Sequence, residues 1–290
     1  MDDGPVSTFI TAPDGLRLHA CSFGSRSASA LPVICLPGLT RTTADFDALA
    51  AALAGDGANP RRVIALDYRG RGQSDYDRDP ANYNFQVELA DALAVATALD
   101  ALPAVFIGTS RGGILTMLLA VVRPTAIAGV VLNDIGPVIE PQGLMRIKGY
   151  VGKMPQPRDF TEAATILKRL FDHQFPKLTD ADWLASAHRA FKQDNGRLVP
   201  TYDVNLANTM EGVDLEKPLP ALWKEFDALG ETPLMVIRGA NSDLLSPATV
   251  AAMQARRPIE TLEVPDQGHA PLLVEPDVIA RIAAFVTRCG

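Results

Sequence analysis

The sequence predicts an α/β fold built on one mostly parallel, doubly wound sheet with helices on both faces. Continuous apolar runs alternate with amphipathic helical patterns along most of the chain, which is the signature of strand and crossover helix. The apolar run at 32–36 shows no polar face, as expected for a parallel strand that is covered on both sides. A chain of 290 residues with 47% hydrophobic residues is long enough for one large domain with an insertion.

The chain is predicted to open with an antiparallel hairpin, because residues 6–12 and 16–23 flank the turn sequence Pro13-Asp14-Gly15. The apolar run at 32–36 is the first buried strand. The later strands are expected at 62–67, 104–108, 128–132, 233–238 and 260–264. The helices between and after them are expected at 43–54, 86–99, 112–122, from Ser246-Pro247 onward, and at 278–286.

The alternation of strand and helix patterns stops between residues 137 and 230. Three helical patterns replace it, at 143–154, 160–175 and 181–192. Because this block is too long for a simple crossover, we predict a helical cap, or lid, of residues 137–230 on a core of residues 1–136 and 231–290. The cap is expected over the carboxyl edge of the sheet, where ligands bind in open α/β sheets.

The composition excludes several classes of partner. A formal charge of −7 and a pI near 5.1, without a basic patch, argue against nucleic acid and anionic membranes. The chain shows neither a leader pattern nor an apolar run of membrane-spanning length, so a soluble, cytoplasmic protein is expected. Cys21, Cys35 and Cys289 have no metal-like spacing and are interpreted as reduced structural thiols. No metal or cofactor is predicted.

One motif carries the chemistry. Gly108-Thr109-Ser110-Arg111-Gly112 joins an expected strand to an expected helix, which is the context of a nucleophile elbow. Such a turn holds the serine in a strained backbone conformation at a cost of about 1 to 3 kcal/mol. Gly108 and Gly112 lack the Cβ atoms that would clash there. The motif therefore predicts Ser110 as a nucleophile.

A serine nucleophile needs a base, and the base needs an acid that orients it. Of the four histidines, only His269 lies in a loop directly after an expected buried strand. We predict Asp243 as the acid, because the order Ser110, Asp243, His269 is typical of hydrolases with a nucleophile elbow. Asp134, at the end of the strand that follows the elbow, stays as the alternative acid, whereas Asp266 is interpreted as a turn residue.

The oxyanion of an acyl-transfer intermediate needs backbone donors. The amide of Arg111 at the start of the elbow helix and the amide of Leu39 after Pro37-Gly38 are the candidates for an oxyanion hole. The side chain of Arg111 is left open: it pairs with Asp67 or Asp134 at the strand edge, or it reaches an anionic substrate.

Together these residues resemble the α/β-hydrolase superfamily, and the resemblance covers nearly the whole chain. Its marks are the Ser110 motif, the loop Asp67-x-Arg69-Gly70-x-Gly72-x-Ser74, Asp243 after a late strand, and Gly268-His269. The resemblance implies an eight-stranded sheet, a helical cap and hydrolysis through an acyl-enzyme. Many relatives have His-Gly where this chain has Pro37-Gly38, which is a departure at the predicted oxyanion loop.

The first functional hypothesis is a serine carboxylesterase that acts on small to medium esters with apolar groups. Ser110 argues against dehalogenases and epoxide hydrolases, whose nucleophile is an aspartate. A carbon-carbon bond hydrolase or a lactonase would use the same triad and stays open, although ring-cleavage relatives often have tryptophan where this chain has Ala270. The contrasting hypothesis is a non-catalytic binding protein on a hydrolase scaffold. The sequence does not indicate the oligomeric state.

Overall fold

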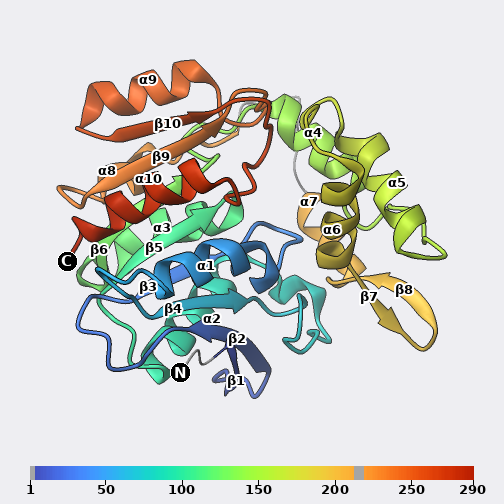
Figure 1. Ribbon diagram of the computed structural model, residues 1–290, viewed down its shortest axis with the longest axis horizontal. Coiled ribbons are helices and arrows are strands. Elements are labelled where there is room, and N and C mark those ends of the chain that lie inside the picture. The colour runs from blue at the N-terminus through green and yellow to red at the C-terminus, as the bar shows by residue number, and fades with distance from the viewer. Residues whose placement is uncertain (1–3, 212–218) are drawn as a thin grey trace.

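A computed structural model describes residues 4–211 and 219–290 of the chain. Its centre is an eight-stranded sheet in the order β1-β2-β4-β3-β5-β6-β9-β10 (Figure 1). Only the pairs β1·β2 and β2·β4 are antiparallel, and the other pairs are parallel. The strands are β1 (Val6–Thr11), β2 (Arg17–Phe23), β3 (Val33–Leu36), β4 (Val63–Asp67), β5 (Ala104–Thr109), β6 (Ile127–Asn133), β9 (Leu234–Gly239) and β10 (Glu260–Val264). The predicted mostly parallel sheet and its opening hairpin are confirmed.

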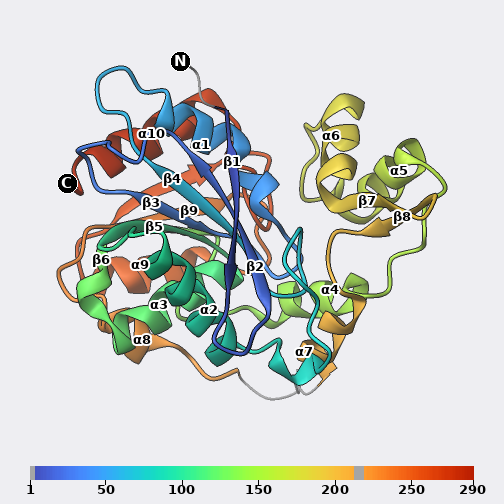
Figure 2. The same ribbon diagram turned by 90° about the horizontal axis from the view of Figure 1, so that it is seen from below.

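Helices cover both faces of this sheet (Figure 2). One face carries α1 (Asp47–Ala54), which follows a short 3₁₀ turn (Thr43–Phe46), and α10 (Pro276–Thr287). The opposite face carries α2 (Phe85–Ala98), α3 (Arg111–Val122), α8 (Trp223–Asp227) and α9 (Pro247–Arg256). The inner strands β3, β4, β5 and β6 are buried on both sides because alternate residues enter two different cores. In β3, Val33 packs with the α1 and α10 side, whereas Ile34 packs with the other.

The insertion between β6 and β9 forms a separate group of elements beside the sheet (Figures 1 and 2). It contains α4 (Pro141–Tyr150), α5 (Phe160–Phe171), α6 (Asp180–Ala190), the hairpin β7 (Phe191–Asp194) and β8 (Arg197–Pro200), and α7 (Asn208–Glu211). Asp159 caps α5 by accepting from the Glu162 amide at 2.8 Å. Apolar side chains of these elements, among them Leu167 and Trp183, form a core of their own.

Several parts of the insertion differ from the sequence-based expectation. The helices expected at 143–154 and 160–175 end earlier, at Tyr150 and Phe171. The helix expected to reach residue 192 ends at Ala190, because the chain turns at Asn195 and Gly196 with φ of 46° and 76° and pairs β7 with β8. Positive φ at both turn residues is typical of a type I′ hairpin, so the Asn-Gly pair was the available signal. Helix α8 lies inside the predicted cap range but packs against α3, on a face of the sheet.

The insertion is joined to the loop after β4 by three short hydrogen bonds. The amide of Gly72 donates to the Thr201 carbonyl and the amide of Asp203 donates to the Gly70 carbonyl, each at 2.7 Å. The hydroxyl of Tyr83 donates to the Asp203 carboxylate at 2.6 Å. These contacts fix one end of the insertion against the core. Within the described residues, no helix is long and apolar enough to span a membrane.

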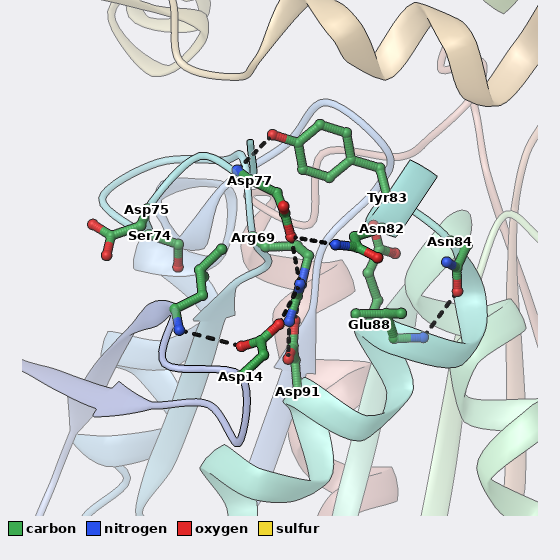
Figure 3. A network of polar contacts seen from close by, with 12 residues as sticks. Asp14, Arg69, Ser74, Asp75, Asp77, Asn82, Tyr83, Asn84, Glu88 and Asp91 are labelled. Atoms are coloured by element: carbon green, nitrogen blue, oxygen red, sulfur yellow. Dashed lines mark hydrogen bonds and ion pairs between the residues drawn. The ribbon is translucent and has the colours of Figure 1, made fainter. Parts of the chain in front are cut away.

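The loop after β4 is itself held by a buried ionic cluster (Figure 3). The Arg69 guanidinium, 1% exposed, contacts Asp91 at 2.6 Å, Asp77 at 2.6 Å and Asp14 at 2.9 Å. Burial raises the pKa of Asp91, and the hydrogen bonds from Arg69 only partly oppose this. Because loss of the cation would leave carboxylates buried without a partner, we interpret the cluster as a structural clamp on the loop.

Candidate active site

Ser110 lies at the turn between β5 and α3, in a backbone conformation that few L residues adopt. Its φ is 51° and its ψ is −112°. A Cβ on Gly108 would lie 2.5 Å from the Gly113 nitrogen, and a Cβ on Gly112 would lie 2.0 Å from the Leu36 carbonyl oxygen. Both contacts are too close for any side chain, so the steric argument made from the Gly-x-Ser-x-Gly motif is confirmed.

His269 lies in the loop after β10 and contacts two side chains from other strand ends. Its Nε2 atom is 2.8 Å from Ser110 Oγ. Its Nδ1 atom is 2.8 Å from Asp134 Oδ2. Both distances are in hydrogen-bond range, so the three side chains form one continuous hydrogen-bonded relay. The imidazole is therefore placed between a hydroxyl and a carboxylate.

The Asp134 carboxylate is fully buried and held from several sides. Its Oδ1 accepts from the Gly239 amide at 2.8 Å, and its Oδ2 accepts from the Ser242 hydroxyl at 2.6 Å. Asp134 follows β6, and its φ is 55°. This turn and these donors fix the carboxylate in one orientation toward His269, which a relay of this kind requires.

The expectation that Asp243 contacts His269 is wrong. Its carboxylate instead forms a two-pronged ion pair with Arg146 of α4, with contacts of 2.7 and 2.9 Å. Burial opposes the charge on Asp243, but Arg146 overrides it and lowers the pKa of the carboxyl group. The alternative acid, Asp134, occupies the place at the imidazole. Asp266 is an exposed turn residue with φ of 56°, as predicted.

The two amides predicted for an oxyanion hole are those of Arg111, which follows Ser110 in the chain, and of Leu39. The Arg111 amide begins α3, where the helix dipole favours negative charge. Leu39 lines the same cavity as Ser110. Within the chain as described, neither amide donates a hydrogen bond to another protein group. Their role as oxyanion donors stays a prediction.

Arg111 is not among the residues that line this cavity, and its side chain has a partner that the sequence analysis missed. Its Nε donates to Glu88 of α2 at 2.5 Å, and its guanidinium lies 4.1 Å above the Phe85 ring. Glu88 also contacts Arg71 at 2.7 Å. Burial would raise the pKa of Glu88, but these two arginines lower it. Arg111 is thus paired with neither Asp67 nor Asp134, and both of these expectations are wrong.

A second serine, histidine and aspartate lie in one hydrogen-bonded row elsewhere on the sheet. Ser7 Oγ is 2.6 Å from His19 Nε2, and His19 Nδ1 is 2.7 Å from Asp67 Oδ2. Asp67 also accepts from the amides of Thr43 at 2.8 Å and Gln73 at 3.1 Å. The sequence analysis placed residues 16–23, which include His19, in the second arm of the opening hairpin, and it did not detect this row because its members are far apart in the sequence.

A cavity of about 280 Å³ opens beside Ser110 and His269. Its wall comes from both the core and the insertion, and the insertion contributes mainly apolar side chains, Tyr150, Leu167, Phe171 and Trp183 among them. Two basic side chains, Arg41 and Arg189, also line it. Which side chains of the insertion face the cavity cannot be read from the sequence, because the orientation of the insertion's helices decides it.

A parallel sheet with a strained serine at the strand-helix turn, a relayed histidine and an adjoining cavity defines the hydrolase class of α/β proteins. Residues 33–282 match the family described as the alpha/beta hydrolase family. The chain therefore belongs to the alpha/beta hydrolase family, as the sequence motifs suggested.

Relatives and solved structures agree with this membership. The chain is 34% identical over 299 residues to the 3-hydroxybutyrate-oligomer hydrolase of Cupriavidus necator, covering 99% of each protein. It is 25% identical over 247 residues to the sn-1-specific diacylglycerol lipase ABHD11 of Mus musculus, covering 82% of this chain and 74% of that one. The crystal structure of an alpha/beta hydrolase from Novosphingobium aromaticivorans is similar with a TM-score of 0.88, at 40% identity and 98% coverage of both chains.

Proposed function

We propose that the protein is a serine hydrolase that cleaves carboxylic esters of small to medium apolar substrates through an acyl-enzyme. Ser110 is the nucleophile, His269 the base and Asp134 the acid that orients the base. One observation carries this proposal: the relay of two 2.8 Å contacts ends at a serine on the wall of a cavity. Ser, His and Asp in this geometry are a recurring solution to acyl transfer on unrelated folds.

Acylation follows from the relay. His269 Nε2 takes the proton of Ser110 Oγ as the oxygen attacks the ester carbonyl carbon. Asp134 holds Nδ1–H and stabilises the imidazolium that forms. The carbonyl oxygen becomes an oxyanion, which the amides of Leu39 and Arg111 stabilise. Removal of one such donor costs about 2.7 to 4 kcal/mol of transition-state stabilisation.

Collapse of the intermediate breaks the bond to the alcohol oxygen, and His269 returns its proton to that oxygen. Water then enters, loses a proton to His269 and attacks the acyl carbon of the Ser110 ester. Breakdown of this second intermediate releases the carboxylic acid and restores the Ser110 hydroxyl. The net reaction is ester plus water to acid plus alcohol, with no cofactor in the balance.

The names of two relatives support the ester bond as the target. Oligomers of 3-hydroxybutyrate and diacylglycerols are both carboxylic esters, and the two relatives are named as a hydrolase and a lipase of these compounds. The apolar wall beside Ser110 supports a substrate with aliphatic or aromatic groups. The alternatives are carbon-carbon bond hydrolysis, lactone hydrolysis and ligand binding without turnover.

A panel of p-nitrophenyl esters with acyl chains of increasing length tests the proposal. We expect turnover by the wild-type protein, no turnover by Ser110→Ala, and wild-type rates for Ser7→Ala, which removes the hydroxyl of the other Ser-His-Asp row. A lactone and a vinylogous 1,5-diketone, run beside the esters, test the two other hydrolytic reactions. Absence of ester turnover, or ester turnover that survives in Ser110→Ala, would overturn the proposal.

A further inference from the structure

We propose that Arg41 and Arg189 form a carboxylate-binding subsite in the cavity, so that the preferred substrates are esters carrying a free carboxylate a few bonds from the ester group. This inference rests on the ester hydrolase function proposed above and names its substrate class. Neither arginine takes part in the proton relay. Both line the cavity that Ser110 and His269 share.

Arg41 lies next to the reactive serine. A Cβ built on Gly38 would be 3.4 Å from Arg41 Cγ and 3.8 Å from Ser110 Cβ, so both side chains border the same small volume. The Arg41 Nε is 3.7 Å from Asp45 Oδ2, which is an ion-pair contact beyond hydrogen-bond range. Among the described residues, no group accepts a hydrogen bond from this guanidinium. Its donors are available to a ligand.

Arg189, in the insertion, also lies close to the Asp45 carboxylate. Its Nε is 3.5 Å from Asp45 Oδ1, and its Nη2 donates to the Ser186 hydroxyl at 3.0 Å. Burial lowers the pKa of Arg189, with Asp45 acting against the shift and Arg41 adding to it. Two guanidinium groups thus share one loosely held carboxylate. A second carboxylate placed between them would gain charge-assisted hydrogen bonds.

Asp47 is the other acid on this wall, at the first turn of α1. Burial and the neighbouring Asp45 raise the pKa of Asp47. The two acids therefore offset the charge of the two arginines, while the fixed fork of each arginine keeps unused donors. The subsite therefore selects a ligand by the geometry of these hydrogen-bond donors rather than by net charge.

The rest of the wall fits the remainder of such a substrate. Tyr150, Leu167, Phe171 and Trp183 give an apolar surface suited to a short aliphatic chain. The carboxylate belongs either to the alcohol part, as in a linear dimer of 3-hydroxybutyrate, or to the acyl part, as in a half-ester of glutaric acid. Both place an anion a few bonds from the ester, and the experiment separates them.

The test compares each acid with its neutral ester: the 3-hydroxybutyrate dimer with its methyl ester, and monoethyl glutarate with diethyl glutarate. We expect wild type to prefer one or both acids in kcat/KM. For each acid that wild type prefers, we expect Arg41→Gln and Arg189→Gln to lower the ratio of kcat/KM for the acid to kcat/KM for its neutral ester about 10- to 100-fold. This is the effect of losing a hydrogen bond to a charged group. The control Arg158→Gln removes a charge from an exposed arginine and keeps the wild-type ratio.

Asp45→Asn gives a prediction of opposite sign. Removing the carboxylate that the two arginines share should lower KM for the acid and raise the acid-to-neutral ratio several-fold. A purely structural role for Asp45 would lower turnover of both substrates alike. A ratio that stays at the wild-type value in Arg41→Gln and Arg189→Gln, or a wild type without preference for either acid, would overturn the inference.

Binding without turnover separates this inference from the function on which it rests. In the Ser110→Ala background, calorimetry with 3-hydroxybutyrate and with glutarate should show binding that Arg41→Gln weakens about tenfold or more. If the anions bind in an Arg41-dependent way but the wild-type protein cleaves no ester, the proposed ester hydrolase function is wrong and the subsite stands. If the wild-type protein cleaves esters but Arg41→Gln leaves anion binding unchanged, only the subsite is wrong.

Discussion

The molecule contains two rows of serine, histidine and aspartate that differ little in hydrogen-bond length. In the first, Ser110, His269 and Asp134 are joined by contacts of 2.8 and 2.8 Å. In the second, Ser7, His19 and Asp67 are joined by contacts of 2.6 and 2.7 Å. By residue type and distance alone, both rows would qualify as catalytic triads. Their surroundings separate them.

Ser110 stands on a strained turn with φ of 51°, at the start of a helix and on a cavity wall. Ser7 lies in the regular edge strand β1, paired with Cys21 of β2, and is exposed. Asp134 is held by donors at the end of β9 and in the loop after it, whereas Asp67 accepts from amides of Thr43 and Gln73 and thereby fixes the loop after β4. A serine relay therefore needs oxyanion donors and room for substrate before it can perform chemistry.

The largest expected effect that follows from this comparison is on turnover. Ser110→Ala should lower kcat on a p-nitrophenyl ester by about 10⁴-fold or more, because the nucleophile is lost and only binding and oxyanion contacts remain. Steady-state kinetics with a purified, folded variant measure this. Residual activity within tenfold of wild type would show that another group attacks the ester.

The next largest effect on turnover is expected from replacing the proposed acid, Asp134. Asp134→Asn should lower kcat by about 10³- to 10⁴-fold, because the amide no longer holds the imidazole in the tautomer that accepts the serine proton. Asp243→Asn is the matched comparison, because the Asp243 carboxylate pairs with Arg146. This substitution should lower kcat less than tenfold. A larger loss in Asp243→Asn than in Asp134→Asn would reverse the assignment of the acid.

The second row should show its effect in stability. Asp67→Ala removes the acceptor for His19 and for the amides of Thr43 and Gln73, and should lower the free energy of unfolding by about 3 kcal/mol. Urea unfolding measures the change. A variant with wild-type stability but without turnover would contradict the structural role given to this row.

The smallest effect is expected for Ser7→Ala. The hydroxyl is at an exposed strand position, so its loss should change the free energy of unfolding by about 1 kcal/mol or less. Turnover should stay within about twofold of wild type. A strong decrease in turnover would mean that the two rows are not functionally distinct.

Most of the sheet and the elbow could be predicted from the sequence because their signals are local. Apolar runs bounded by turn residues located the strands, and Gly108 and Gly112 marked the place where a side chain would collide with the backbone. The Asn195-Gly196 pair carried the hairpin signal, but the helical pattern before it was extended too far.

Which aspartate contacts His269 could not be predicted, because Asp134 and Asp243 lie near the ends of the neighbouring strands β6 and β9. Arg146, from the insertion, pairs with one of them, and the Ser242 hydroxyl donates to the other. Such long-range pairings leave no periodic trace in the sequence. The Arg111 partner was missed for the same reason, since Glu88 belongs to a different helix.

The most direct test of the central claim is the site and rate of labelling by a fluorophosphonate, followed by intact mass and peptide mapping. A single phosphonyl group on Ser110 is predicted, formed at the wild-type rate in Ser7→Ala and at least about 100-fold more slowly in Asp134→Asn. Labelling of another residue, or an unchanged rate in Asp134→Asn, would contradict the account.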